Sequence, residues 1–187
     1  MKEEIGRQLI EGAETRRKAA DECAPDIEKA AKMLIDCLKR GNKLLICGNG
    51  GSAADSQHIA AELVWRFKKE RQPLPAIALT TDTSAITAIA NDASFDLIFS
   101  RQIEALASKG DVLFALSTSG NSKNVLEAAN SAKKMGVKVV AFTGRDGGKL
   151  KALSDICICV PADGTDRIQE VHIAAAHIIC GLVEEEF

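Results

Sequence analysis

The sequence predicts an α/β fold in which a doubly wound parallel sheet is flanked by helices, with extra helices at the N-terminus. From residue 43 onward, short apolar blocks alternate with longer stretches of helical spacing, which is typical of that fold class. The apolar residues within a block are continuous, as expected for parallel strands buried on both faces. Two turns rich in glycine and serine, residues 48–52 and 117–122, each follow such a block and open a helical stretch.

Residues 1–40 are expected to form two helices that precede the sheet. Pro25 separates them, because proline is not accommodated in the middle of a helix, and Gly41 ends the second. The apolar positions at helical spacing are Ile5, Leu9, Ile10, Ile27, Ala30, Ala31, Leu34 and Leu38. Because amphipathic helices outside the alternating unit need an apolar partner, we expect an oligomerisation extension that packs on a second copy of the chain. The alternative is that these helices pack on their own sheet.

Five strands and six further helices follow. The strands are expected at residues 43–47, 76–79, 111–116, 137–142 and 156–160. The helices are expected at residues 53–67, 83–90, 95–107, 122–134, 150–153 and 167–184. Ser52, followed three residues later by Asp55, resembles a capping box that would begin the first of these helices. Pro73 and Pro75 follow the end of that helix, and Gly136 ends the fourth.

The composition is typical of a single-domain cytoplasmic protein. With 187 residues and 46% hydrophobic content the chain can bury one sizeable core, so residues 1–187 are expected to form one domain. The 24 basic and 26 acidic residues give a net charge of -2, without the basic excess of a nucleic-acid-binding protein. No run approaches the roughly 18 apolar residues that span a membrane, and the N-terminus lacks the apolar core of a signal peptide. We therefore expect no nucleic-acid partner and no membrane association.

The six cysteines are expected to be reduced thiols in the core. They occur mostly inside apolar runs and never with the Cys-x-x-Cys spacing that is typical of structural zinc sites. Their positions are Cys23, Cys37, Cys47, Cys157, Cys159 and Cys180.

The two glycine- and serine-rich turns have the chemistry of a phosphate site. The first contains Gly48, Asn49, Gly50, Gly51 and Ser52, and the second contains Ser117, Thr118, Ser119, Gly120, Asn121 and Ser122. Glycine lets the backbone approach an anion closely, and hydroxyl groups donate hydrogen bonds to it. Free N–H groups and the dipole at the start of a helix also favour negative charge. A phosphorylated small molecule is therefore the expected ligand.

Two helices carry side chains suited to proton transfer or metal binding. His58 and Glu62 are four residues apart in the helix after the first turn, so both project from one face. An ion pair on the helix surface would have the same spacing. The other two histidines, His172 and His177, lie in the last helix with Gln169. Histidine exchanges protons near neutral pH and commonly binds metals, although for His172 a capped or solvent-facing position is the alternative.

The spacing within the last helix bears on how such a site is assembled. Gln169 and His177 are eight residues apart, which is roughly 12 Å along a regular helix and roughly 80° around it. One straight helix would not easily bring both side chains to one ion. Either the side chains reach around the helix, or neighbouring copies of the chain contribute different groups, which would place the sites at subunit interfaces.

Four segments together resemble the phosphoheptose isomerases, a branch of the sugar isomerase (SIS) family. They are CGNGGSAADSQHIAAE at residues 47–62, AIAND at residues 88–92, STSGNS at residues 117–122, and RIQEVH at residues 167–172 followed by His177. The resemblance covers nearly the whole chain, whereas either turn alone would indicate only the SIS fold. It implies an aldose–ketose isomerase that converts D-sedoheptulose 7-phosphate to D-glycero-D-manno-heptose 7-phosphate through an enediol, in bacterial heptose biosynthesis for lipopolysaccharide or other surface glycans.

The same resemblance implies roles for individual residues. It implies substrate binding by Asn49, Gly50, Gly51, Ser52, Asn91, Asp92, Ser117, Thr118, Ser119, Ser122 and Gln169. It implies one zinc ion per subunit, held by His58, Glu62, Gln169 and His177. Glu62 and His177 are also implied as the catalytic acid–base pair. The resemblance further implies a homotetramer with sites between subunits.

Two other classes of function remain as alternatives. A non-catalytic binding scaffold with the SIS fold, such as a replication-initiator-associating protein, would need no acid–base pair, whereas this chain has both Glu62 and His177. A SIS regulatory module would bind a sugar phosphate without converting it. Product analysis after incubation with sedoheptulose 7-phosphate distinguishes the three.

Overall fold

The computed structural model describes residues 1–187, and its elements follow the predicted order. The strands are β1 (Leu44–Cys47), β2 (Ala76–Ala78), β3 (Val112–Leu116), β4 (Lys138–Gly144) and β5 (Ile156–Val160). The helices are α1 (Lys2–Glu22), α2 (Ala24–Lys39), α3 (Gly51–Val64), α4 (Thr83–Asp92), the 3-10 helix η1 (Phe95–Leu97), α5 (Ser100–Leu106), α6 (Lys123–Lys134), α7 (Gly148–Leu153) and α8 (Thr165–Glu184). The predicted fold class is confirmed, and the helix expected at residues 95–107 is divided into η1 and α5. None of the helices is both long and apolar enough to cross a membrane.

The five strands form one parallel sheet with the order β2-β1-β3-β4-β5. Successive residues of β1 enter two different cores: Leu44 and Ile46 pack on one face of the sheet, and Leu45 and Cys47 pack on the other. The chain leaves β1 toward β2 on one side and then returns to β3 on the opposite side, so the strand order reverses between β1 and β3. In sheets of this kind, ligands bind outside the carboxyl ends of the strands at that reversal.

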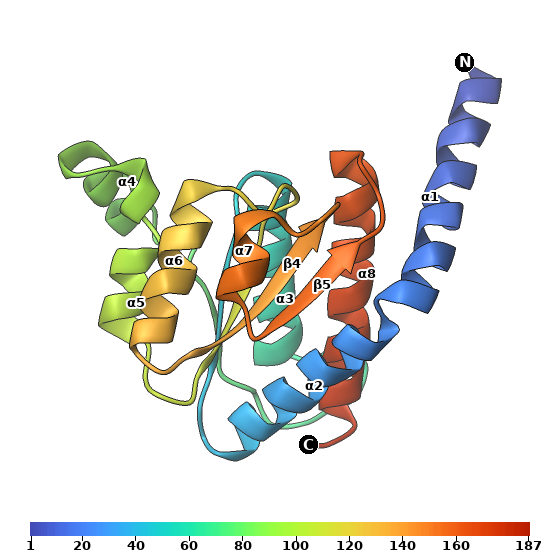
Figure 1. Ribbon diagram of the computed structural model, residues 1–187. Helices are drawn as coiled ribbons and strands as arrows, with labels where there is room; N and C mark the ends of the chain where they lie inside the picture. The colour runs from blue at the N-terminus through green and yellow to red at the C-terminus, as the bar shows by residue number, and fades with distance from the viewer.

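Helices cover both faces of the sheet, which makes three layers (Figure 1). The helices α2, α3 and α8 pack on the face that carries Ile46, Phe114 and Phe142. The helices α5, α6 and α7 pack on the face that carries Leu45 and Leu113. On the first face α3 contacts α8, and this pairing positions the candidate site.

The two N-terminal helices behave differently from each other. α2 packs on α8 and on the sheet, whereas α1 contacts α8 through its C-terminal half and projects from the body of the molecule at its N-terminal end (Figure 1). Along α1 the side chains of Ile5, Leu9 and Ile10 are more than half exposed. The alternative of packing within the chain therefore describes α2 fully, and describes α1 only where Gly12, Thr15 and Ala19 are buried. The oligomeric role of the extension stays a prediction, and the exposed apolar stripe of α1 favours it.

The predicted capping box at the start of α3 is wrong. The helix begins at Gly51 after Gly50, no side chain caps it, and Ser52 already lies inside the first turn. Gly50 has a φ of 55°, a conformation that glycine adopts without strain. The N–H of Ser52 donates to the carbonyl of Asn49, so the backbone of the turn provides the cap that the sequence assigned to a side chain.

The end of α3 also differs from the prediction, because the helix stops at Val64 rather than at Phe67. The Arg71 guanidinium donates to the carbonyl oxygens of Glu62 and Leu63, at 2.8 Å and 2.9 Å. These two carbonyls would otherwise accept from amides of a continuing helix. A basic side chain from the following loop thus ends the helix.

All six cysteines are free, as predicted. Burial raises the pKa of Cys47 and of Cys180 to about 12. Both thiols therefore remain protonated near neutral pH and act as packing groups and not as nucleophiles.

Asp111 joins the start of β1 to the start of β3. Its buried carboxylate accepts hydrogen bonds from the backbone N–H groups of Lys43 and Ser108, at 3.0 Å and 2.8 Å, and from the side-chain amide of Asn42. The Lys43 ammonium lies 2.7 Å from it. Burial alone would raise the pKa of this carboxyl, but the hydrogen bonds from Lys43, Ser108 and Asn42 outweigh burial and lower it.

Replacing Asp111→Asn is expected to reduce the free energy of unfolding by about 3 kcal/mol, because it leaves the Lys43 ammonium without its buried partner. The lowered pKa means that the carboxylate stabilises the fold above about pH 4. Its contribution is lost as the pH falls through the lowered value, so the difference between wild type and variant should shrink there. Urea unfolding at several pH values measures this. Asp36→Asn is the matched control, because Asp36 forms only an exposed ion pair with Arg40; an equal loss in both variants would contradict the prediction.

Candidate active site

The first glycine-rich turn connects β1 to α3 at the strand reversal. The N–H groups of Gly50 and Gly51 donate to no other group of the protein, and they stand at the positive end of the α3 dipole. Gly48 must be glycine, because a Cβ there would lie 2.7 Å from the Cβ of Ser52. Ser52 itself is buried beneath the turn. The turn therefore offers backbone donors to an anion.

The second turn connects β3 to α6 on the other side of the reversal. The hydroxyl groups of Ser117 and Ser122 lie 3.0 Å apart, while Thr118 is half-buried and Ser119 is exposed. The backbone is held firmly: the N–H of Gly144 donates to the Thr118 carbonyl at 2.9 Å. Hydroxyl groups and the start of α6 thus converge at one place, as the sequence predicts for a phosphate site.

The two turns are joined directly by a pair of asparagine side chains. The Asn49 amide donates to the Asn124 side-chain oxygen at 2.8 Å, and the Asn124 amide donates back at 2.8 Å. Asn124 was missed by the sequence analysis. Its position two residues after Ser122, in the first turn of α6, is the only signal that the sequence offers. The bridge fixes the separation of the two turns at the carboxyl ends of β1 and β3.

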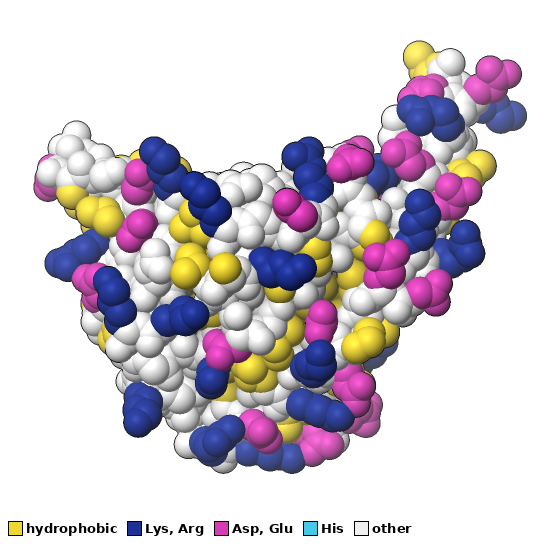
Figure 2. Space-filling view, viewed as in Figure 1, with side chains coloured by type: hydrophobic (Ala, Val, Ile, Leu, Met, Phe, Trp, Pro, Cys, Tyr) yellow, Lys and Arg dark blue, Asp and Glu magenta, His cyan; other side chains and the backbone are white.

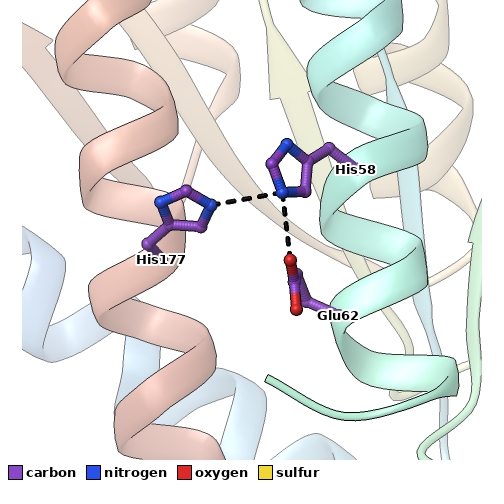
Figure 3. A group of neighbouring side chains, drawn as sticks. All are labelled: His58, Glu62 and His177. Carbon is purple, nitrogen blue, oxygen red and sulfur yellow. Dashed lines mark hydrogen bonds and ion pairs between the residues drawn. The ribbon is translucent and has the colours of Figure 1, made fainter. Parts of the chain in front are cut away.

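A cluster of three side chains lies where α3 meets α8 (Figure 3). His58 and Glu62 project from α3, and His177 projects toward them from α8. The Nε2 atom of His58 lies 3.0 Å from Glu62 Oε1 and 3.3 Å from His177 Nε2. The structure therefore brings the predicted carboxylate and the predicted imidazole together within a single chain.

The geometry of this cluster fits a divalent metal ion. The donor atoms of His58, Glu62 and His177 all lie within 4.8 Å of one another. In a tetrahedral zinc site with bonds of about 2.1 Å, neighbouring ligand atoms are about 3.4 Å apart. The two distances at His58 Nε2 are close to that edge length. Two imidazoles and a carboxylate are also ligand types that zinc accepts.

The remaining predicted site residues lie elsewhere in the chain. The Gln169 side chain rests on Gly51, since a Cβ on Gly51 would be 2.8 Å from its amide atoms, and it makes no hydrogen bond to the three-residue cluster. Asn91 and Asp92 are exposed in the last turn of α4, where the Asn91 amide donates to the Asp92 carboxylate at 2.7 Å. The structure does not bring these two residues to either turn.

The surface around the carboxyl ends of the strands is hollowed. In the space-filling view, the molecule is concave between two projections, α4 on the left and α1 on the right (Figure 2). The helix α4 packs on η1 and buries none of its residues fully. Both projections are therefore exposed: α1 carries exposed apolar side chains, and α4 has no buried residue.

His172 is a buried structural histidine, which corrects the capped or solvent-facing alternative. It is 1% exposed and packs edge-on against Phe142. Its Nε2 lies 3.0 Å from the Thr143 carbonyl, and since a carbonyl only accepts, Nε2 carries the hydrogen. Its Nδ1 has no partner. His172 thus ties α8 to the end of β4, next to the Gly144 amide that holds the second turn.

The chain is similar in sequence and in structure to known proteins. The SIS domain family model matches residues 10–144. The phosphoheptose isomerase of a Nitratiruptor species is 54% identical over 187 residues, which is 100% of both chains. That of Helicobacter pylori is 50% identical over 183 residues, covering 98% of this chain and 95% of the relative. The solved structure of a phosphoheptose isomerase from Neisseria gonorrhoeae is 44% identical, with a TM-score of 0.94 over 98% of both chains. That from Francisella tularensis is 38% identical, with a TM-score of 0.95 over 98% of this chain and 97% of the other.

His172 is expected to make the fold sensitive to mild acid. Burial lowers its pKa from 6.5 to about 4, against the opposing effect of its hydrogen bond to Thr143. Between these values the unfolded chain binds a proton that the folded chain does not, so stability should fall as the pH falls through this range. The expected loss is up to about 3 kcal/mol. Denaturant unfolding of wild type and His172→Gln at about pH 7.5 and about pH 4.5 measures it; a variant that loses as much stability as wild type would contradict this role.

Proposed function

We propose a reaction for this chain, which belongs to the SIS domain family and, within it, to the phosphoheptose isomerases. It converts D-sedoheptulose 7-phosphate to D-glycero-D-manno-heptose 7-phosphate, an aldose–ketose isomerisation in bacterial heptose biosynthesis. The observation that carries the assignment to residues is the convergence of Glu62 and His177 at one place, on the helix that follows the first turn and on the helix that packs against it. A binding scaffold or a regulatory module would have no need of that pair.

The phosphate end of the sugar is held by the second turn. Ser117, Thr118, Ser119 and Ser122 donate hydroxyl and backbone hydrogen bonds to the phosphate at the start of α6. The first turn, residues 49–52, and Gln169 contact the rest of the substrate, since Gln169 already lies against Gly51. The Asn49–Asn124 bridge keeps the two turns at a constant separation, so both ends of the ligand are positioned together.

The proton transfers need one base and one acid. A proton leaves C1 of the ketose and returns at C2, while another proton moves from the oxygen on C1 to the oxygen on C2. Glu62 takes and returns the carbon proton, and the imidazole of His177 moves the proton between the oxygens. Glu62 has one carboxylate oxygen, Oε1, facing His58, which leaves the other free to act as the base.

His58, Glu62, Gln169 and His177 would hold a zinc ion, one for each subunit. The spacing of the three clustered groups supports this set, and Gln169 would need to turn from Gly51 to join them. When bound, zinc polarises a carbonyl group and stabilises developing negative charge, an effect of several kcal/mol.

The assembly we propose is a cytoplasmic homotetramer whose sites lie at subunit interfaces. Residues 1–40 form its oligomerisation extension, and the rest of the single domain carries the site. The exposed apolar stripe of α1 supports this, as do the exposed side chains of Ile178 and Leu182 on α8. Asn91 and Asp92 would then serve a neighbouring subunit, because α4 holds them away from the turns of their own chain.

Replacing Glu62→Gln is expected to lower kcat by on the order of a thousandfold, because the amide cannot accept the carbon proton. Binding of the phosphorylated substrate should persist, since the turns are unchanged. Incubation with sedoheptulose 7-phosphate, followed by product analysis and by calorimetric binding, measures both quantities. Glu70→Gln, which alters an exposed carboxylate in the loop after α3, is the matched control. A near-normal rate in Glu62→Gln would remove Glu62 from the mechanism, and substrate binding without conversion by wild type would favour the regulatory module.

Removing the metal is expected to lower kcat by about a hundredfold or more, which is the size of effect that Lewis-acid stabilisation supplies. Treatment with a chelator, dialysis and metal analysis would establish the metal-free state. Restoring zinc should then restore the rate in wild type but not in a His58→Ala variant. Full activity in protein shown to be free of metal would make the ion unnecessary for turnover.

A further inference from the structure

Glu184, at the end of α8, is a buried carboxylate with an unusual set of partners. It accepts hydrogen bonds from three consecutive backbone N–H groups, those of Phe67, Lys68 and Lys69, at 2.9 Å, 2.7 Å and 2.9 Å. The residue is 4% exposed. Burial alone would raise the pKa of the carboxyl, but these hydrogen bonds and the nearby Arg71 outweigh burial and lower it. An ionised carboxylate therefore holds three successive amides of the loop through both of its oxygens.

The segment that Glu184 holds is the loop that follows α3. Arg71 belongs to the same arrangement, because its Nε lies 3.4 Å from Glu184 Oε1 while its terminal nitrogens donate to the carbonyls at the end of α3. The side chains of Arg71 and Glu184 are 2% and 3% exposed. One buried ion pair thus joins the C-terminal end of α3 to the C-terminal end of α8. These are the two helices that carry His58, Glu62 and His177.

The held loop places an aromatic ring on the candidate site. The ring of Phe67 stacks on the imidazole of His177, with 5.4 Å between centroids and 25° between planes, an offset stacked geometry. The same ring lies over Gly181, one turn further along α8, where a Cβ would be 3.5 Å away. The Lys68 ammonium lies 4.9 Å from the ring centroid. The face of His177 is therefore covered by a ring whose backbone is anchored by Glu184.

We propose that Phe67 is a positioning residue for His177, and that Glu184 holds Phe67 in place through the loop amides. His177 has no hydrogen bond other than the contact of its Nε2 with His58. A stacked ring restricts the rotation of the imidazole, so that Nε2 stays directed at His58 and Glu62. This role rests on the proposed function, because Phe67 acts only through His177.

Three substitutions at position 67 test the role of the ring. Phe67→Ala removes the ring, Phe67→Leu keeps an apolar side chain without a flat face, and Phe67→Tyr keeps the ring. The Ala and Leu variants are expected to lose about tenfold or more in kcat and in zinc affinity, the effect typical of losing a group that orients a ligand. KM for the phosphorylated sugar should change little, because the turns that bind the phosphate are untouched. Phe67→Tyr should retain the wild-type values.

A spectroscopic measurement separates positioning from loss of stability. The chain has three histidines, so the ring proton resonances of His177 can be assigned in protein labelled at histidine. The ring current of Phe67 should shift the His177 resonance upfield in wild type and in Phe67→Tyr, and the shift should vanish in Phe67→Ala. The resonance of His172, which contacts Phe142 and not Phe67, should stay in place in every variant.

Two further variants test the anchor. Glu184→Gln cannot accept from all three amides and removes the charge beside Arg71, so the His177 resonance should broaden or move and kcat should fall in the same direction as in Phe67→Ala. Lys69→Ala is the matched control. It keeps the backbone N–H that Glu184 binds and removes only an exposed ion pair with Glu185, so all measured quantities should match wild type.

Either of two results would overturn the proposal. One is a wild-type kcat, zinc affinity and His177 resonance in Phe67→Ala. The other is a Phe67→Tyr variant as impaired as Phe67→Ala, which would mean that ring stacking is not what matters. Failure of the proposed function is recognised separately, because wild type would then fail to convert the sugar. The histidine resonances would still decide whether Phe67 orients His177.

Discussion

The contact between α3 and α8 is the constraint on which the candidate site depends. Each helix carries an incomplete set of groups: His58 and Glu62 lie on α3, and His177 lies on α8. The cluster exists only because the sheet places both helices on the same face, where they can touch. The chain reinforces this contact at the end remote from the anion-binding turns, where Glu184 and Arg71 join the ends of both helices inside the protein. Small changes in how the helices pack would therefore alter the distances between the three clustered side chains.

The site is built from two parts with different origins. The part proposed to bind the anion is local: each turn follows a strand and begins a helix, so its free N–H groups follow from the chain direction alone. The part proposed for proton transfer is non-local, because His58 and His177 are 119 residues apart in the chain. The parallel sheet unites the parts, since it aligns the carboxyl ends of β1 and β3 at the strand reversal. The Asn49–Asn124 bridge then fixes the separation of the two turns.

Three buried polar side chains connect segments that are distant in the chain. Asp111 joins the starts of β1 and β3, His172 joins α8 to β4, and Glu184 joins α8 to the loop after α3. Each makes a hydrogen bond to backbone groups of another segment, which specifies one relative placement of the two. The exposed ion pairs, such as Arg7 with Glu4 on α1, lie within one helix and contribute little to stability. Buried polar groups with hydrogen-bond partners thus fix the relative positions of helices, strands and loops, which the exposed ion pairs within one helix do not.

The sequence by itself determined the α/β class, the five strands, the place of the two glycine- and serine-rich turns and the family, because these follow from apolar periodicity and from motifs contiguous in the chain. It also identified His58, Glu62 and His177 as candidates, but spacing along a helix reports only which side chains share a face. The tertiary structure decided that these faces meet, that His172 is buried, that Asn124 bridges the two turns, and that Phe67, bound by Glu184, stacks on His177. Those facts depend on strand order and on hydrogen bonds between distant segments, which no local pattern encodes.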